Sequence, residues 1–160
     1  MDSLFFTEEH KMIQRMVSEF AKDEIIPVAR ELDKTGEFPK NIVKKMGSLG
    51  LMGINVPTEY GGSGLDMVSY AAAIIELAKA DASIAITMAA HTSLGTLPIL
   101  LYGSTSLKKK YLPKIASGET LSAFGLTEPQ AGSDAGSTKT TATKLGDDYI
   151  INGGKIFITN

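Results

Sequence analysis

The sequence predicts an all-α helical bundle followed by the opening strands of a β domain. Up to residue 118, apolar side chains recur at the three- and four-residue spacing of helices, and capping residues and glycines separate the segments. From residue 119, β-formers, alternating threonines and glycine-containing turns replace that spacing. We therefore place a helical domain at residues 1–118 and the start of a β domain at residues 119–160.

The first helix begins after Thr7, which is followed by two glutamates near the positive end of the helix dipole. One face of this helix carries the apolar residues Ile13, Met16, Val17, Phe20 and Ile25. Pro27 has no N–H to donate, so it predicts a kink or break near Ile26. A second short helix begins around Pro39 and ends near Gly50.

Asp66 is placed to cap the next helix, whose residues are almost all small or apolar. Such a composition indicates a helix packed inside the domain. A further helix covers roughly residues 83–102 and contains His91, which we interpret as a hydrogen-bonded core or interface residue. Ser104 caps the last helix, whose run of three lysines we interpret as a solvated face.

The β part is predicted to contain short strands that are separated by turns. Strands are expected at residues 120–127, 138–144, 149–151 and 155–160, with a turn at 146–148 and a hairpin signal at 152–154. A lone hairpin is marginally stable in water, so we expect this β domain to be truncated.

Composition excludes several classes of function. The net charge is −2 and no basic segment stands out, which argues against a nucleic-acid partner. The chain has no cysteine and only two histidines, far apart, so no metal site is expected. The apolar residues 83–101 are interrupted by His91, Gly95 and Pro98, which indicates a buried helix rather than a membrane span. We expect no membrane association and a cytoplasmic protein, since no leader pattern precedes the first helix.

The most informative stretch runs from Gly125 to Ser137 and reads Gly-Leu-Thr-Glu-Pro-Gln-Ala-Gly-Ser-Asp-Ala-Gly-Ser. Its glycines, hydroxyls and free N–H groups are suited to an anion such as a phosphate. The glycine spacing is neither that of a P-loop nor that of a dinucleotide fingerprint. Most Gly/Ser turns bind no ligand, so chemistry alone favours a solvent loop.

Four sequence blocks, in order, resemble the acyl-CoA dehydrogenase family. The stretch 125–137 resembles the family signature, and residues 151–160, Ile-Asn-Gly-Gly-Lys-Ile-Phe-Ile-Thr-Asn, resemble its second flavin segment. Residues 56–64 resemble a loop between early helices, and residues 78–83 resemble a helix junction. The resemblance covers essentially the whole chain and implies that the β strands begin the family's β-barrel-like middle domain.

The resemblance implies an FAD site. It places Phe124 along the flavin, Leu126 and Thr127 at the pyrimidine edge, and Ser133 near both the FAD pyrophosphate and the substrate. It further places Phe157 against the isoalloxazine, where many relatives have tryptophan, and the Thr159 hydroxyl at N5.

The resemblance also implies an activity. Family members oxidise acyl-CoA to trans-2-enoyl-CoA in fatty acid β-oxidation, pass electrons to an electron-transferring flavoprotein, and form homotetramers. Their catalytic glutamate lies in a C-terminal domain beyond residue 160, so we assign no catalytic residue here. Eukaryotic members reside in the mitochondrial matrix. An acyl-CoA oxidase or flavin monooxygenase on the same scaffold, or a non-catalytic helical interaction module, stays open as an alternative.

Overall fold

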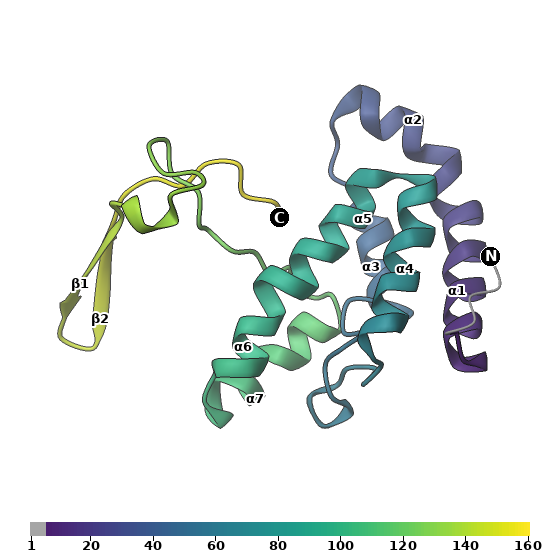
Figure 1. Ribbon diagram of the computed structural model, residues 1–160, viewed down its shortest axis with the longest axis horizontal. Helices are drawn as coiled ribbons and strands as arrows, with labels where there is room; N and C mark the ends of the chain where they lie inside the picture. Colours follow the sequence, from purple (N-terminus) through teal and green to yellow (C-terminus); the bar gives the residue numbers. More distant parts are fainter. Residues whose placement is uncertain (1–5) are drawn as a thin grey trace.

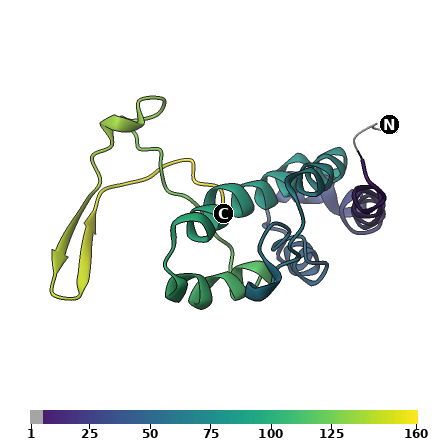
Figure 2. The same cartoon turned by 60° about the horizontal axis from the view of Figure 1, so that its bottom comes forward.

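The computed structural model describes residues 6–160, and it consists of a helical bundle and a two-stranded antiparallel hairpin (Figure 1). The two parts lie at opposite ends of the molecule in both views, joined by extended chain (Figure 2). The predicted order, helices first and strands after them, is confirmed.

The first helical stretch is continuous but contains a π-helical turn. Helix α1 (Glu8–Phe20) is capped by Thr7, whose hydroxyl accepts the N–H of His10 at 3.3 Å. The π turn η1 (Ala21–Ile25) then leads into α2 (Ile26–Thr35), where Pro27 occupies the first turn. The predicted interruption near Ile26 is therefore a change of helix type, because the Ile26 N–H bonds five residues back.

Helix α3 (Lys40–Ser48) follows Pro39 and stops where Gly50 adopts a positive φ of 75°. The glycine-rich loop after it contains the short 3₁₀ turn η2 (Thr58–Tyr60). A Cβ on Gly62 would overlap the backbone carbonyl of Val56, so this loop needs glycine for its own packing.

Helices α4 (Met67–Ala80) and α5 (Ala82–Ala89) begin at aspartate caps, as predicted for the first of them. The Asp66 carboxylate accepts the Ser69 N–H at 2.8 Å, and that of Asp81 accepts the Ile84 N–H at 2.9 Å. The expectation that α4 is enclosed is wrong for one of its faces, on which Met67 is 54% and Ile75 is 52% exposed. Among the described residues, α1, η1 and α5 pack on its other face.

Helix α5 continues through the π-helical turn η3 (Ala90–Thr96) into α6 (Leu97–Tyr102), so the predicted helix over 83–102 is confirmed. By length and composition alone, Ala82–Tyr102 is apolar enough to cross a membrane, and half of its most apolar window is buried in the protein. A core helix meets the same criteria. Helix α7 (Thr105–Ala116) begins at the Ser104 cap, and Lys109 and Lys110 are exposed.

The main core lies between α1, α3, α4 and α5. Its fully buried members include Val17, Ile25, Met46, Leu77, Ile84 and Met88. A smaller cluster of Val56, Leu112 and Ala116 holds α7 against the loop after α3.

The hairpin pairs β1 (Thr141–Leu145) with β2 (Asp148–Asn152) in a register that places Leu145 opposite Asp148. The two-residue turn has Gly146 first, with φ 61°, as type II′ turns favour. The predicted turn at 146–148 and the strand around 149–151 are confirmed. The predicted strand at 138–144 is shifted toward the turn.

Two other expectations for the β part are wrong. Residues 120–127 and 155–160 are not strands, and Asn152–Gly154 does not form the hairpin turn. A strand requires a continuous hydrogen-bonded ladder with a neighbour. The backbone bond between these two stretches joins Ile156 N–H to Thr127 O at 2.9 Å, and a single bond does not make a ladder.

Candidate functional site

The two segments singled out by the sequence meet in space. The Thr127 carbonyl accepts the Ile156 N–H at 2.9 Å, and the Lys155 ammonium donates to the Leu126 carbonyl at 3.0 Å. The chain leaves the helices, passes through the turns and hairpin, and returns beside its outgoing path (Figure 1). Residues 126–127 and 155–156, separated by the whole hairpin in sequence, therefore form one structural unit.

A buried carboxylate lies at the centre of this unit. The Glu128 side chain is only 2% exposed and pairs with the Lys155 ammonium at 2.8 Å. Its two oxygens also accept the backbone N–H groups of Lys139 at 2.7 Å and Thr140 at 3.0 Å. Lys155 and then the surrounding donors hold the pKa of Glu128 well below its ordinary value, so the group is ionised at neutral pH.

The turn after Glu128 is closed by two backbone hydrogen bonds between Glu128 and Ala131, both 3.0 Å long. It exposes Gly132 and Ser133, and a Cβ on Gly132 would meet no atom within 4 Å. Ala131 is buried, at 2% exposure. The backbone at Gly132 is thus open to a ligand, whereas Glu128 and Ala131 are held by their backbone hydrogen bonds.

The apolar candidate residues lie on the surface. Phe124 is 46% exposed, Leu126 is 43% exposed and Phe157 is 91% exposed. Phe157 also adopts a left-handed backbone with φ 55°, a conformation that costs a non-glycine residue about 1–3 kcal/mol and that is concentrated at functional sites. The Phe157 ring is therefore accessible in this chain.

The hydroxyl candidates occupy three different positions. Thr127 is half-buried beside the Ile156 backbone, whereas Ser133 lies exposed in the turn. Thr159 lies at the end of the chain, in a hollow against α5 that Ser83, Ile86, Thr87 and Leu121 also line. The structure thus joins the Leu126–Thr127 stretch to the segment that leads to Phe157.

The end of the chain is tied to the helical bundle. The Asn160 side-chain amide donates to the Thr87 carbonyl at 3.0 Å and to the Ser122 carbonyl at 3.3 Å. Asn160 also has a positive φ of 69°. These contacts place Thr159 between the two parts of the chain.

His91 fixes the start of the extended segment to the helical core. Its ring is fully buried, Nε2 lies 3.2 Å from the Met52 carbonyl, and Nδ1 accepts the Ser122 N–H at 3.1 Å. Burial lowers the pKa of His91, which keeps the ring neutral. The prediction of a hydrogen-bonded core histidine is confirmed, and His91 is not a base of the site.

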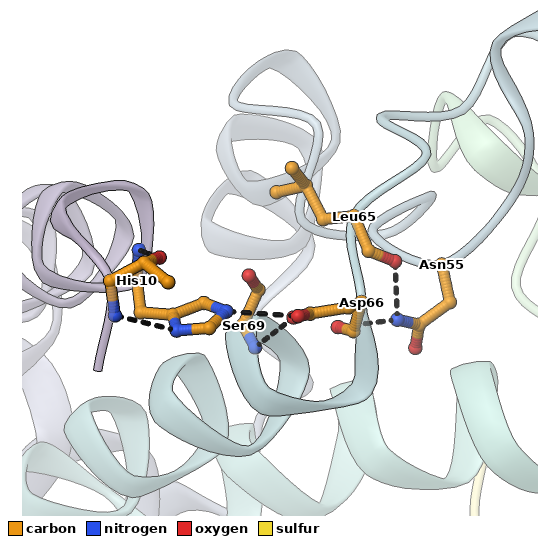
Figure 3. Close-up of polar contacts among 6 residues, drawn as sticks. His10, Asn55, Leu65, Asp66 and Ser69 are labelled. Atoms are coloured by element: carbon orange, nitrogen blue, oxygen red, sulfur yellow. Dashed lines mark hydrogen bonds and ion pairs between the residues drawn. The ribbon is translucent and has the colours of Figure 1, made fainter. Parts of the chain in front are cut away.

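The other histidine forms a separate polar cluster (Figure 3). His10 Nδ1 accepts the Thr7 N–H at 3.1 Å, so Nε2 carries the proton that is directed at the Asp66 carboxylate, 2.9 Å away. The Asn55 amide donates to the carbonyls of Leu65 and Asp66. This cluster fastens α1 to the start of α4, on the side of the bundle away from the hairpin (Figure 1). It is a structural joint.

Among residues 6–160, no group of three or more His, Asp or Glu side chains is arranged to hold a metal ion. The 124–133 and 155–159 segments instead offer apolar side chains, hydroxyls and free backbone. Such groups suit an organic cofactor with a flat ring and a phosphate-bearing end better than a metal.

The sequence alone predicted no role for Glu128, Lys155 or Asn160. A glutamate before a proline in a polar turn has the appearance of a solvated residue, and its burial depends on backbone donors 11 and 12 residues away. The one available signal was that Glu128 and Lys155 each lie inside a block that resembles the family.

Comparison with known proteins agrees with this geometry. The acyl-CoA dehydrogenase N-terminal domain matches residues 7–119, and the acyl-CoA dehydrogenase middle domain matches residues 123–160. An acyl-CoA dehydrogenase of Bacillus subtilis is 53% identical over 154 residues, which are 96% of this chain and 41% of the relative.

Two solved structures are similar to the chain over 98% of its length. Acyl-CoA dehydrogenase complexed with FAD from Bacillus anthracis has a TM-score of 0.92 and 45% identity, over 27% of its own chain. Butyryl-CoA dehydrogenase from Megasphaera elsdenii has a TM-score of 0.92 and 39% identity, over 42% of its own chain.

The chain spans about two fifths of the length of the Bacillus subtilis relative and of the butyryl-CoA dehydrogenase. The matched regions are the helical N-terminal domain and the beginning of the middle domain. The chain therefore belongs to the acyl-CoA dehydrogenase family, as shown by these similarities and supported by the order of its elements and the contact between its two signature segments.

Proposed function

We propose that this chain is the N-terminal part of an FAD-dependent acyl-CoA dehydrogenase and that it supplies one side of the flavin site. One observation carries the proposal. The segment that contains Thr127 and the segment that contains Phe157 both resemble flavin segments, and they are hydrogen-bonded to one another. A relative of similar fold was solved as a complex with FAD.

Each candidate residue has a role that fits its position. Leu126 and Thr127 present backbone and hydroxyl donors at the pyrimidine edge of the flavin, where donors fixed in advance stabilise negative charge on the reduced ring. Phe157, which is exposed, packs on the isoalloxazine, and Phe124 lies along it. The Thr159 hydroxyl lies where the β domain meets α5 and serves N5.

Ser133 serves the phosphate end of the site. It follows Gly132 on an open turn, where a hydroxyl and free backbone can approach a pyrophosphate without steric hindrance. The same position allows contact with the thioester substrate.

The reaction proposed is the oxidation of acyl-CoA to trans-2-enoyl-CoA. Bound FAD supplies the electron acceptor, and its electrons pass on to an electron-transferring flavoprotein. We assign α-proton removal to a group outside residues 6–160. Glu128, the buried carboxylate of the site, is ionised and already accepts several hydrogen bonds, which makes it a poor base. By resemblance, we extend the proposal to a cytoplasmic homotetramer.

The test uses the whole protein that contains this chain, purified and assayed with butyryl-CoA and octanoyl-CoA. We expect stoichiometric bound FAD, dye reduction that depends on the acyl-CoA, and no matching oxygen consumption. Stoichiometric oxygen consumption would identify an oxidase or monooxygenase instead. A well-folded protein without flavin would favour a non-catalytic helical module and contradict the proposal.

A further inference from the structure

Among the described residues, the Glu128–Lys155 ion pair holds together three separate stretches of the β part. The Glu128 carboxylate reaches Lys155 at 2.8 Å, Lys139 N–H at 2.7 Å and Thr140 N–H at 3.0 Å. The Lys155 ammonium in turn donates to the Leu126 carbonyl at 3.0 Å. These groups thus connect the signature segment, the start of β1 and the second flavin segment.

The burial of the pair is unusual for this region. Both strands of the hairpin are exposed along their whole length, whereas the Glu128 side chain is 2% and the Lys155 side chain 28% exposed. A buried ion pair is costly to form, and it is strongly destabilising to break because one charge is left without a partner. The pair therefore fixes the geometry of the backbone groups that it binds.

That geometry concerns the backbone beside the candidate cofactor surface. Lys155 holds the Leu126 carbonyl on one side of the chain, which fixes the orientation of the peptide that precedes Thr127. The lysine stem also lies against Gly125, where an added Cβ would be 3.4 Å from Lys155 Cγ. In the second segment, Lys155 is followed by Ile156, whose N–H donates to the Thr127 carbonyl, and then by Phe157 with its left-handed backbone.

We propose that Glu128 and Lys155 are positioning residues of the flavin site, which hold the Leu126–Thr127 backbone and the Phe157 ring at a fixed separation around the cofactor. This inference rests on the proposed function. The pair acts by setting where Thr127 and Phe157 lie.

The experiment compares four variants of the whole, FAD-loaded protein. Glu128→Gln and Lys155→Met each remove one charge at nearly constant size, and Lys155→Arg keeps the charge. Glu119→Gln is the matched control, because it neutralises a glutamate in an ion pair with Lys114 at 3.1 Å whose two side chains are both 62% exposed. The measurements are the FAD dissociation constant, the visible flavin spectrum, kcat and KM for butyryl-CoA, and the thermal midpoint.

We expect Glu128→Gln and Lys155→Met to weaken FAD binding by about tenfold or more, since each leaves a buried group without its charged partner. The flavin band should shift and kcat should fall more than KM rises. Lys155→Arg should recover most of the affinity, and Glu119→Gln should match the parent.

A lower thermal midpoint with unchanged flavin affinity, spectrum and kcat would show a merely structural pair and overturn the inference. If Glu128→Gln does not fold, Lys155→Met and Lys155→Arg still decide, because the partly exposed lysine can be replaced with less disruption. An unsubstituted protein that binds no FAD would overturn the proposed function and this inference together. If the unsubstituted protein binds FAD and the Glu128 and Lys155 variants match it in FAD affinity, spectrum and kcat, this inference alone is overturned.

Discussion

The helical part and the β part of this chain are held together by different forces. In the helical part, Val17, Met46, Leu77 and other apolar side chains are completely buried between α1, α3, α4 and α5. Burial of each such side chain contributes about 1.5–3 kcal/mol. In the hairpin every residue is exposed, and Ile151 is 70% exposed. What organises the β part is polar: the Glu128–Lys155 pair and a few backbone bonds.

This difference explains how the site is built. The helical bundle has its own core, so it can serve as a rigid base to which His91 and Asn160 attach the rest of the chain. The β part leaves Phe124, Leu126 and Phe157 uncovered, and these are the apolar residues assigned to the flavin. Within this chain these three side chains are accessible to a ligand.

Substitutions in the helical core and in the hairpin should differ most in their effect on the free energy of unfolding. In the 160-residue chain, Leu77→Ala should reduce the free energy of unfolding by about 2–5 kcal/mol, because it opens a cavity in the core. Ile151→Ala should change it by no more than about 0.5 kcal/mol, because the side chain is already exposed. Urea titrations followed by helical circular dichroism measure both. An equal loss of unfolding free energy in Leu77→Ala and Ile151→Ala would mean that the two parts share a single core.

The next largest effect on stability is expected for His91, which connects the extended segment to the helical core. The pKa of His91 is lowered by burial from 6.5, so the neutral ring stabilises the folded chain fully above that pH and progressively less as the pH falls through the lower folded value. His91→Leu should cost about 1–3 kcal/mol at neutral pH, since the Met52 carbonyl and the Ser122 N–H lose their partner.

The check on His91 is a pair of stability–pH curves for the parent and the variant. They should converge below pH 6.5, because only the parent loses the contribution of the neutral ring. Curves that stay parallel throughout would show that the ring does not titrate as a buried group.

A smaller difference in stability is expected between substitutions of two aspartate N-caps, Asp66 and Asp81. Asp81→Ala should cost about 1 kcal/mol, the usual value of an N-cap. Asp66→Ala should cost more, because Asp66 also accepts the His10 bond that fastens α1 to α4. The Ser69 N–H and then His10 lower the pKa of Asp66 from 3.8 to about 2, so its extra contribution is present above 3.8 and is lost as the pH falls toward 2. Thermal melts at pH 7 and pH 2 test this, and an equal cost for both caps at pH 7 would contradict it.

The helices could be predicted because their signals are local. Thr7, Asp66 and Ser104 cap their helices as the sequence indicates, and the apolar spacing identifies Val17 and Ile25 as buried. The π-helical turns escaped prediction because their spacing differs from an α-helix by a single residue over one turn.

The β part was less predictable because its order depends on contacts between distant segments. β-formers at 120–127 indicate a strand only where a partner strand is available, and none pairs with them among the described residues. The charged partner of Glu128 is Lys155, which lies 27 residues away in the sequence. The left-handed backbone of Phe157 has no signal in the residue type, since an aromatic residue disfavours it.

The most direct test of the flavin site is the midpoint potential of bound FAD in the whole protein with Thr127→Val. Thr138→Val, at another half-buried threonine of the same region, is the matched control. We expect a lower midpoint potential in Thr127→Val alone, because a donor that stabilises the reduced ring has been removed. A potential in Thr127→Val equal to that of the parent and of Thr138→Val would contradict the claim that this segment borders the flavin.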